Sequence, residues 1–123
     1  MSTEDPAQSA AHAGGTASDI PIEPQSLEWM RRLVAIPSIS GTSNLGVIEL
    51  IEAEFARYGY TGQRTYNADQ TRANLWVTVP AADGSTEGGI VISGHTDVVP
   101  VEGQTWDSDP FTLRVEGSRA YGR

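Results

Sequence analysis

The sequence predicts an α/β fold in which helices flank a mixed, mainly parallel sheet. In the first half of the chain, apolar residues recur at the spacing of two amphipathic helices, and the period then changes to that of strands. In the second half, Ile90-Val91-Ile92 is a continuous apolar run with glycines close on either side. Such a run is typical of a strand buried on both faces, as in the parallel sheet of an α/β protein.

Residues 1–24 are expected to form a disordered tail. They contain no aromatic and no Arg or Lys residue and are rich in Ala, Ser, Gly, Pro and Thr. Such a segment cannot bury enough apolar surface to offset the entropy lost on ordering. The composition changes at Gln25, so residues 25–123 are expected to hold the folded part, and their length suits one domain.

Two helices are expected after the tail. Ser26 is the expected N-cap of a helix that ends near Ile36, and Ser43 or Asn44 is the expected cap of a second helix that ends near Tyr58. Three glutamates of the second helix lie mostly off its apolar stripe, which favours a solvated face over a metal cluster. The expected stripes are Leu27, Met30, Leu33 and Val34 in the first helix and Leu45, Ile48, Ile51, Phe55 and Tyr58 in the second.

Strands are expected in the remainder of the chain. Residues 61–66 are a weak candidate, and residues 73–79 are a better one because they are rich in β-forming residues and end before a proline. Residues 90–92 are the expected buried strand. Residues 111–115 and 118–121 are expected to pair as a hairpin.

Charge and composition exclude several classes of protein. The formal net charge is −8, from 16 acidic residues and 8 basic residues that are all arginine. This balance argues against a nucleic-acid partner, which would need a basic patch. The chain has no cysteine, which excludes a disulfide scaffold and a thiol nucleophile. No apolar run approaches the length of a membrane helix and no signal segment begins the chain, so a cytoplasmic protein without a membrane partner is expected.

The residues that indicate chemistry follow the apolar run directly. In α/β sheets, ligands bind beyond the carboxyl ends of the strands. Side chains two residues apart in extended backbone project to the same side, so His95 and Asp97 are expected to touch while Thr96 points away. A carboxylate that accepts the second ring N–H of a metal-bound histidine fixes its tautomer. Taken alone, a His-x-Asp tripeptide is more often a surface hydrogen bond, and one histidine cannot hold a metal.

The sequence around the tripeptide strengthens its interpretation as part of a functional site. Residues 93–111, SGHTDVVPVEGQTWDSDPF, and the final Tyr-Gly-Arg resemble the zinc-dependent aminoacylase and carboxypeptidase family of co-catalytic metallopeptidases. The part from Gly94 to Pro100 is similar across close relatives within this family. The continuation is more similar to the members that remove the acetyl group of N2-acetyl-L-ornithine, and so are residues 26–29 and 43–46.

The resemblance covers about residues 25–123 and implies the N-terminal, incomplete part of a dizinc peptidase-like catalytic domain. It implies that His95 is a ligand of one of a pair of zinc ions, with cobalt as an alternative metal, and that Asp97 is the catalytic-site carboxylate that orients the ring. The substrate would be a small N-acyl amino acid, and the full-length enzyme would be a homodimer. The family's remaining metal ligands and its general base are not in this sequence, so the chain alone is expected to be inactive.

Two alternatives to this interpretation remain open. The first keeps the family and changes the substrate to succinyl-diaminopimelate or a dipeptide. The second is a small acidic α/β interaction module without catalysis, which accounts for the tail, the charge and the length. It does not account for a buried strand that ends in His95-Thr96-Asp97.

Overall fold

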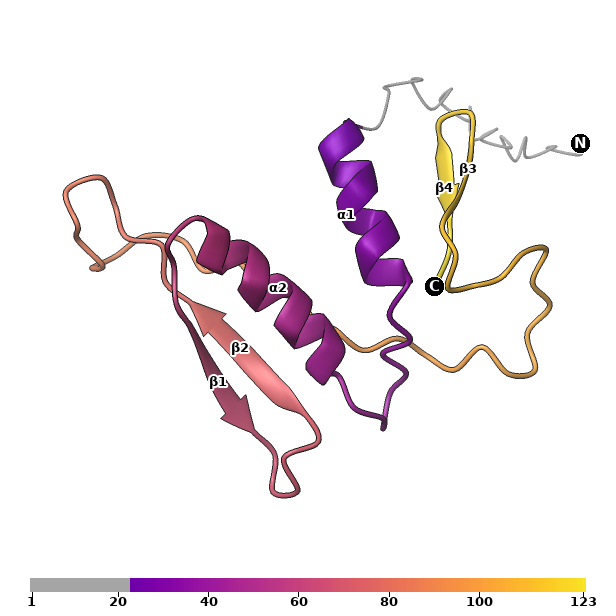
Figure 1. Ribbon diagram of the computed structural model, residues 1–123, viewed down its shortest axis with the longest axis horizontal. Coiled ribbons are helices and arrows are strands. Elements are labelled where there is room, and N and C mark those ends of the chain that lie inside the picture. Colours follow the sequence, from indigo (N-terminus) through magenta and orange to yellow (C-terminus); the bar gives the residue numbers. More distant parts are fainter. Residues whose placement is uncertain (1–22) are drawn as a thin grey trace, which may run out of the picture.

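Two helices precede four short strands in residues 23–123, the part of the chain that the computed structural model describes. The tail expected at 1–24 lies outside these residues except for its last two. In chain order the elements are α1 (Pro24–Val34), α2 (Leu45–Arg57), β1 (Gly62–Tyr66), β2 (Ala73–Val77), β3 (Arg114–Glu116) and β4 (Arg119–Tyr121) (Figure 1).

Helix α1 begins three residues earlier than expected. Its N-cap is Glu23, whose carboxylate accepts a hydrogen bond from the backbone N–H of Ser26 at 2.9 Å. The expected cap, Ser26, therefore lies inside the first turn. Pro24 favours this start because its fixed φ suits the first helical position and it has no N–H to satisfy. No residue of α1 is buried.

The apolar core lies where α2 packs against the hairpin of β1 and β2 (Figure 1). Both strands were predicted, and they pair antiparallel from Gly62 opposite Val77 to Tyr66 opposite Ala73. Gly62 permits a close approach between them, because a Cβ there would lie 2.5 Å from Leu75 Cδ1. Buried apolar side chains among the described residues are Val47, Ile48 and Ala73.

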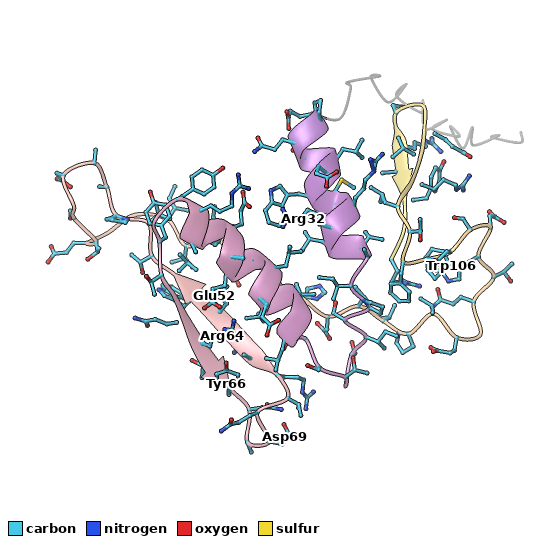
Figure 2. All side chains as sticks on the ribbon, viewed as in Figure 1. Arg32, Glu52, Arg64, Tyr66, Asp69 and Trp106 are labelled. Atoms are coloured by element: carbon cyan, nitrogen blue, oxygen red, sulfur yellow. The ribbon has the colours of Figure 1, made fainter. Side chains whose placement is uncertain are left out.

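Two of the three glutamates of α2 are in ion pairs. Glu52 accepts hydrogen bonds from Arg64 on β1, which ties the helix to the hairpin (Figure 2). Glu54 lies 2.9 Å from Arg57 of its own helix and 3.8 Å from Arg32 of α1. The expectation of a solvated acidic face is therefore wrong for these two residues, and they are not grouped with other carboxylates as metal ligands.

The apolar run at 90–92 does not form the buried strand that its pattern predicts. Ile90, Val91 and Ile92 are 92%, 71% and 94% exposed. The described residues contain two antiparallel two-stranded sheets and no parallel sheet. A strand is stable only beside a hydrogen-bonded neighbour, and no segment of residues 23–123 pairs with this run. The apolar composition of the run indicates that it suits burial. It does not indicate which segment would cover it.

The predicted C-terminal hairpin is present, with Val115 opposite Ala120, but its first strand covers Arg114–Glu116 instead of residues 111–115. Its turn contains Gly117, whose positive φ of 58° suits glycine. Gly122 then passes close to α1, because a Cβ there would lie 2.9 Å from Val34 Cγ1. Neither helix of the described residues has the length and apolar character needed to cross a bilayer.

One amide side chain links the start of α2 to the hairpin. Asn44 is the N-cap of α2 by position, but its side chain does not bond the helix. Its Oδ1 accepts from the N–H of Ala73 at 2.9 Å, and its Nδ2 donates to the carbonyl oxygen of Ala73 at 2.9 Å. The same Nδ2 donates to Thr96 Oγ1 at 3.0 Å. Asn44 therefore joins three segments that are far apart in the sequence.

We predict that Asn44→Ala lowers the free energy of unfolding by about 1–3 kcal/mol, because it leaves the backbone groups of buried Ala73 without partners. Urea denaturation followed by circular dichroism measures the change. The matched control is Asn74→Ala on the exposed face of β2, which should change stability by less than about 0.5 kcal/mol. Equal losses in the two variants would contradict the assigned role.

Candidate metal-ligating site

The structure brings His95 and Asp97 into contact, as the alternation of side chains predicts. His95 Nδ1 lies 3.0 Å from Asp97 Oδ1 and 2.9 Å from the carbonyl oxygen of Asp97. Thr96 points the other way and accepts the hydrogen bond from Asn44. The segment that carries these residues is irregular, because the run before it has no neighbouring strand.

A one-residue parallel bridge holds this segment in place. Ile39 pairs with Val98, through bonds from the N–H of Ser40 to the carbonyl oxygen of Val98 at 2.8 Å and from the N–H of Val98 to the carbonyl oxygen of Ser38 at 2.9 Å. The hydroxyl of Ser38, which is buried, adds a bond of 2.5 Å to the carbonyl oxygen of Thr96. The segment is therefore fixed by backbone bonds at Val98 and by a side-chain bond at Thr96, on either side of Asp97.

The Asp97 carboxylate has a different partner on each oxygen. Oδ1 faces His95 Nδ1, and Oδ2 accepts a hydrogen bond of 2.6 Å from the hydroxyl of Ser40. Hydrogen bonds to the ionised form, first from Ser40 and then from His95, hold the pKa of Asp97 below its ordinary value. Asp97 is therefore a carboxylate, and an acceptor, throughout the neutral pH range.

The hydrogen-bond network assigns the ring proton of neutral His95 to Nδ1. Both oxygens within reach of Nδ1 are acceptors, so Nδ1 is the donor. The lone pair of Nε2 is then free, and 86% of the side chain is exposed. A neutral ring with a free Nε2 and a carboxylate on Nδ1 is the form in which histidine ligates a metal.

The remaining ligands of a metal centre are not among the residues described. Residues 23–123 contain no group of three or more His, Asp or Glu side chains that could hold a metal ion. Asp109, which precedes Pro110, acts instead as a turn residue. Its carboxylate accepts from the N–H of Phe111 and from the hydroxyl of Thr112, each at 2.9 Å. The described residues therefore offer one candidate metal ligand, His95, and the carboxylate that orients it, Asp97.

His95 and Asp97 lie on the wall of an open groove of about 820 Å³. The groove runs between α2, the hairpin and residues 92–97, and Ile48, Trp76 and Asn44 also line it. Its lining contains at least as many polar side chains as apolar ones, so a bound molecule would meet both kinds of surface.

Sequence reasoning missed Ser40, Ser38 and Asn44. Their local pattern indicates only a polar loop and a helix cap. The contact between Ser40 and Asp97 joins residues separated by 57 positions, and no local periodicity reports such a pairing. The one available signal is that the serines alternate around Ile39, as side chains of an extended segment that share a face do.

Comparison with known proteins relates the chain to one kind of hydrolase. An acetylornithine deacetylase of Erwinia tasmaniensis is 35% identical over 106 residues, which covers 80% of this chain and 27% of that enzyme. Acetylornithine deacetylases of Salmonella arizonae and Salmonella agona are each 33% identical, over 80% and 82% of this chain. No family model matches the chain, and no solved structure matches it.

The chain is thus a homologue of the acetylornithine deacetylases, and the resemblance found in its sequence is confirmed. It spans about a quarter of the length of these curated relatives, 27% in each case.

We predict that Ser40→Ala raises the pKa of Asp97 toward its ordinary value, because the bond from Ser40 is the largest cause that lowers it. With its folded-state pKa below the unfolded-state value, Asp97 contributes stability above the unfolded-state pKa. That contribution is lost as the pH falls through the folded-state pKa. The pKa of Asp97 in the wild-type chain and in the variant is measured from carboxyl ¹³C shifts, followed by NMR through the acid range.

The control for this titration is Thr42→Ala. It removes a hydroxyl of the same loop that donates to the carbonyl oxygen of Ile39 and does not contact Asp97. The pKa of Asp97 should stay low in this variant. A rise of equal size in both variants would show that the loop, and not the Ser40 hydroxyl, sets the pKa.

Proposed function

We propose that this chain contributes to the active site of a metal-dependent amide hydrolase that converts N2-acetyl-L-ornithine and water into L-ornithine and acetate. The observation that carries the proposal is the similarity to acetylornithine deacetylases over four fifths of the chain. The contact between His95 and Asp97 supports it, because an oriented neutral imidazole is what a metal-dependent hydrolase requires of a ligand.

In this proposal His95 supplies one metal ligand through Nε2, and Asp97 keeps the proton on Nδ1. The metal, when bound, polarises an amide carbonyl and lowers the pKa of water. Zinc is the expected metal, as a pair of ions, and cobalt is the alternative. The family resemblance also leads us to propose a cytoplasmic homodimer.

The chain's own residues perform three tasks for the reaction. Asp97 holds the ring of His95 in one tautomer, and the bridge between Ile39 and Val98 holds Asp97. The groove beside them is lined by the exposed apolar side chains of Trp76 and Ile92, which can contact the aliphatic part of an acyl amino acid. The site can therefore position both a metal ligand and a substrate.

We predict that the natural protein that contains this chain hydrolyses N2-acetyl-L-ornithine most efficiently. Its kcat/KM on this substrate should exceed its kcat/KM on N-succinyl-diaminopimelate and on a dipeptide. Release of the free α-amino group, measured with each substrate after loading with zinc or cobalt, tests this. Preference for the succinylated substrate or the dipeptide would replace the proposed substrate. Hydrolysis of none of them would favour a module without catalysis.

Paired carboxamide variants test whether the described site carries this activity. Asp97→Asn should lower activity about 10–100-fold, because the ligand's orienting carboxylate is lost. Asp107→Asn makes the same chemical change at an exposed aspartate of the following loop and should leave the activity unchanged. Equal activity in the two variants would remove Asp97 from the site.

We predict that the 123-residue chain by itself binds zinc only weakly, because one histidine and one adjacent carboxylate are too few ligands for a tight site. Isothermal titration calorimetry with zinc measures the affinity, and His95→Ala identifies heat that arises at this site. Submicromolar binding that His95→Ala abolishes would show that the chain assembles a complete metal centre.

A further inference from the structure

We propose that Ser40 is a positioning residue for the metal-ligating histidine, and that it acts through Asp97. Its hydroxyl fixes the rotamer of the Asp97 carboxylate, and the carboxylate in turn keeps the His95 proton on Nδ1 and the Nε2 lone pair free. This inference rests on the proposed function, since it assigns Ser40 a role in the same site.

The first support is the direction of the bonds at Asp97. The Ser40 hydroxyl has one proton to donate, and it lies 2.6 Å from Asp97 Oδ2 and 3.2 Å from the carbonyl oxygen of Val98. The shorter contact is with the ionised acceptor, and hydrogen bonds to charged acceptors are the stronger ones. With Oδ2 occupied by Ser40, Oδ1 is left to face His95.

The second support is that the backbone of Ser40 is anchored, whereas the side chain of Asp97 is not held by burial. The N–H of Ser40 is bonded to Val98, so the serine belongs to the bridge between the two segments. The side chain of Asp97 is 54% exposed, and water can compete for its oxygens. Without the hydroxyl, the carboxylate would be free to rotate among its rotamers. The ring would then lose its charged acceptor and keep only the carbonyl oxygen of Asp97, at 2.9 Å.

The third support is that two neighbouring hydroxyls of this loop donate to other acceptors. Ser38 donates to the carbonyl oxygen of Thr96, and Thr42 donates to the carbonyl oxygen of Ile39. Neither bonds Asp97, so the role belongs to Ser40 and the neighbours offer matched controls.

The tautomer of His95 in the metal-free 123-residue chain tests the proposal. Ring ¹⁵N shifts are measured by NMR well above the ordinary histidine pKa, where the ring is neutral, and His12→Gln removes the signals of the other histidine. In the wild-type chain the Nδ1–H tautomer should dominate. In Ser40→Ala the ratio of Nδ1–H to Nε2–H should fall about five-fold, the equivalent of one hydrogen bond.

Three variants separate positioning from general damage. Ser40→Thr keeps a hydroxyl at the same place and should restore the wild-type ratio, and Thr42→Ala should leave it unchanged. In an Asp97→Ala background, Ser40→Ala should have no further effect, because the route to the ring is already absent. An unchanged ratio in Ser40→Ala, or an equal fall in the Asp97→Ala background, would overturn the proposal.

A measurement on the wild-type chain keeps the proposal testable if Ser40→Ala does not fold. The three-bond couplings of Asp97 should report a single χ1 rotamer, and averaged couplings would overturn it. The inference also fails separately from the proposed function. Deacetylation with an unresponsive tautomer rejects the role of Ser40 alone, whereas a responsive tautomer in a protein that hydrolyses no acyl amino acid rejects only the function.

Discussion

The single bridge between Ile39 and Val98 is the constraint on which the site depends. Residues 93–97 have no ladder of their own, so nothing in regular secondary structure fixes them. The bridge supplies a fixed point directly after the site, and the Ser38 hydroxyl supplies another at Thr96. The geometry of His95 follows from these bonds, because its acceptor lies between the two fixed points.

The molecule therefore uses different forces in its two halves. Burial of Val47, Ile48 and Ala73 holds α2 on the hairpin, and that contact excludes water. The site is held by hydrogen bonds, most of them between exposed or half-buried groups, and each contributes only about 0.5–1.5 kcal/mol net. Segments held in this way open more readily than a packed core does. The side chain of Asn44 connects the halves, because it bonds both Ala73 and Thr96.

The features that the sequence predicted are those with a local cause. Helical spacing located α1 and α2, and alternation placed His95 beside Asp97. The features that were missed or wrong depend on distant partners. The cap of α1 is the exception, since Glu23 and Ser26 are only three residues apart and the longer side chain of Glu23 reaches the N–H of Ser26.

The larger error concerned the parallel sheet, and its cause is again the dependence on a distant partner. A continuous apolar run specifies an environment without naming the segments that create it, and residues 23–123 contain no segment that pairs with 90–92. The contact between Ser40 and Asp97 was invisible for a related reason, since a hydroxyl and a carboxylate 57 residues apart share no period.

The exposed run has a consequence for the behaviour of the chain in concentrated solution. Three adjacent β-branched side chains attract strands from other molecules, and cross-β stacking requires about six or seven such residues in succession. Here the run is bounded by Gly88 and Gly89, whose φ values of 71° and 93° lie outside the extended region, and Glu87 adds charge. These neighbours interrupt the extended backbone and add charge on the N-terminal side of the run, which opposes its extension into a longer stacking segment.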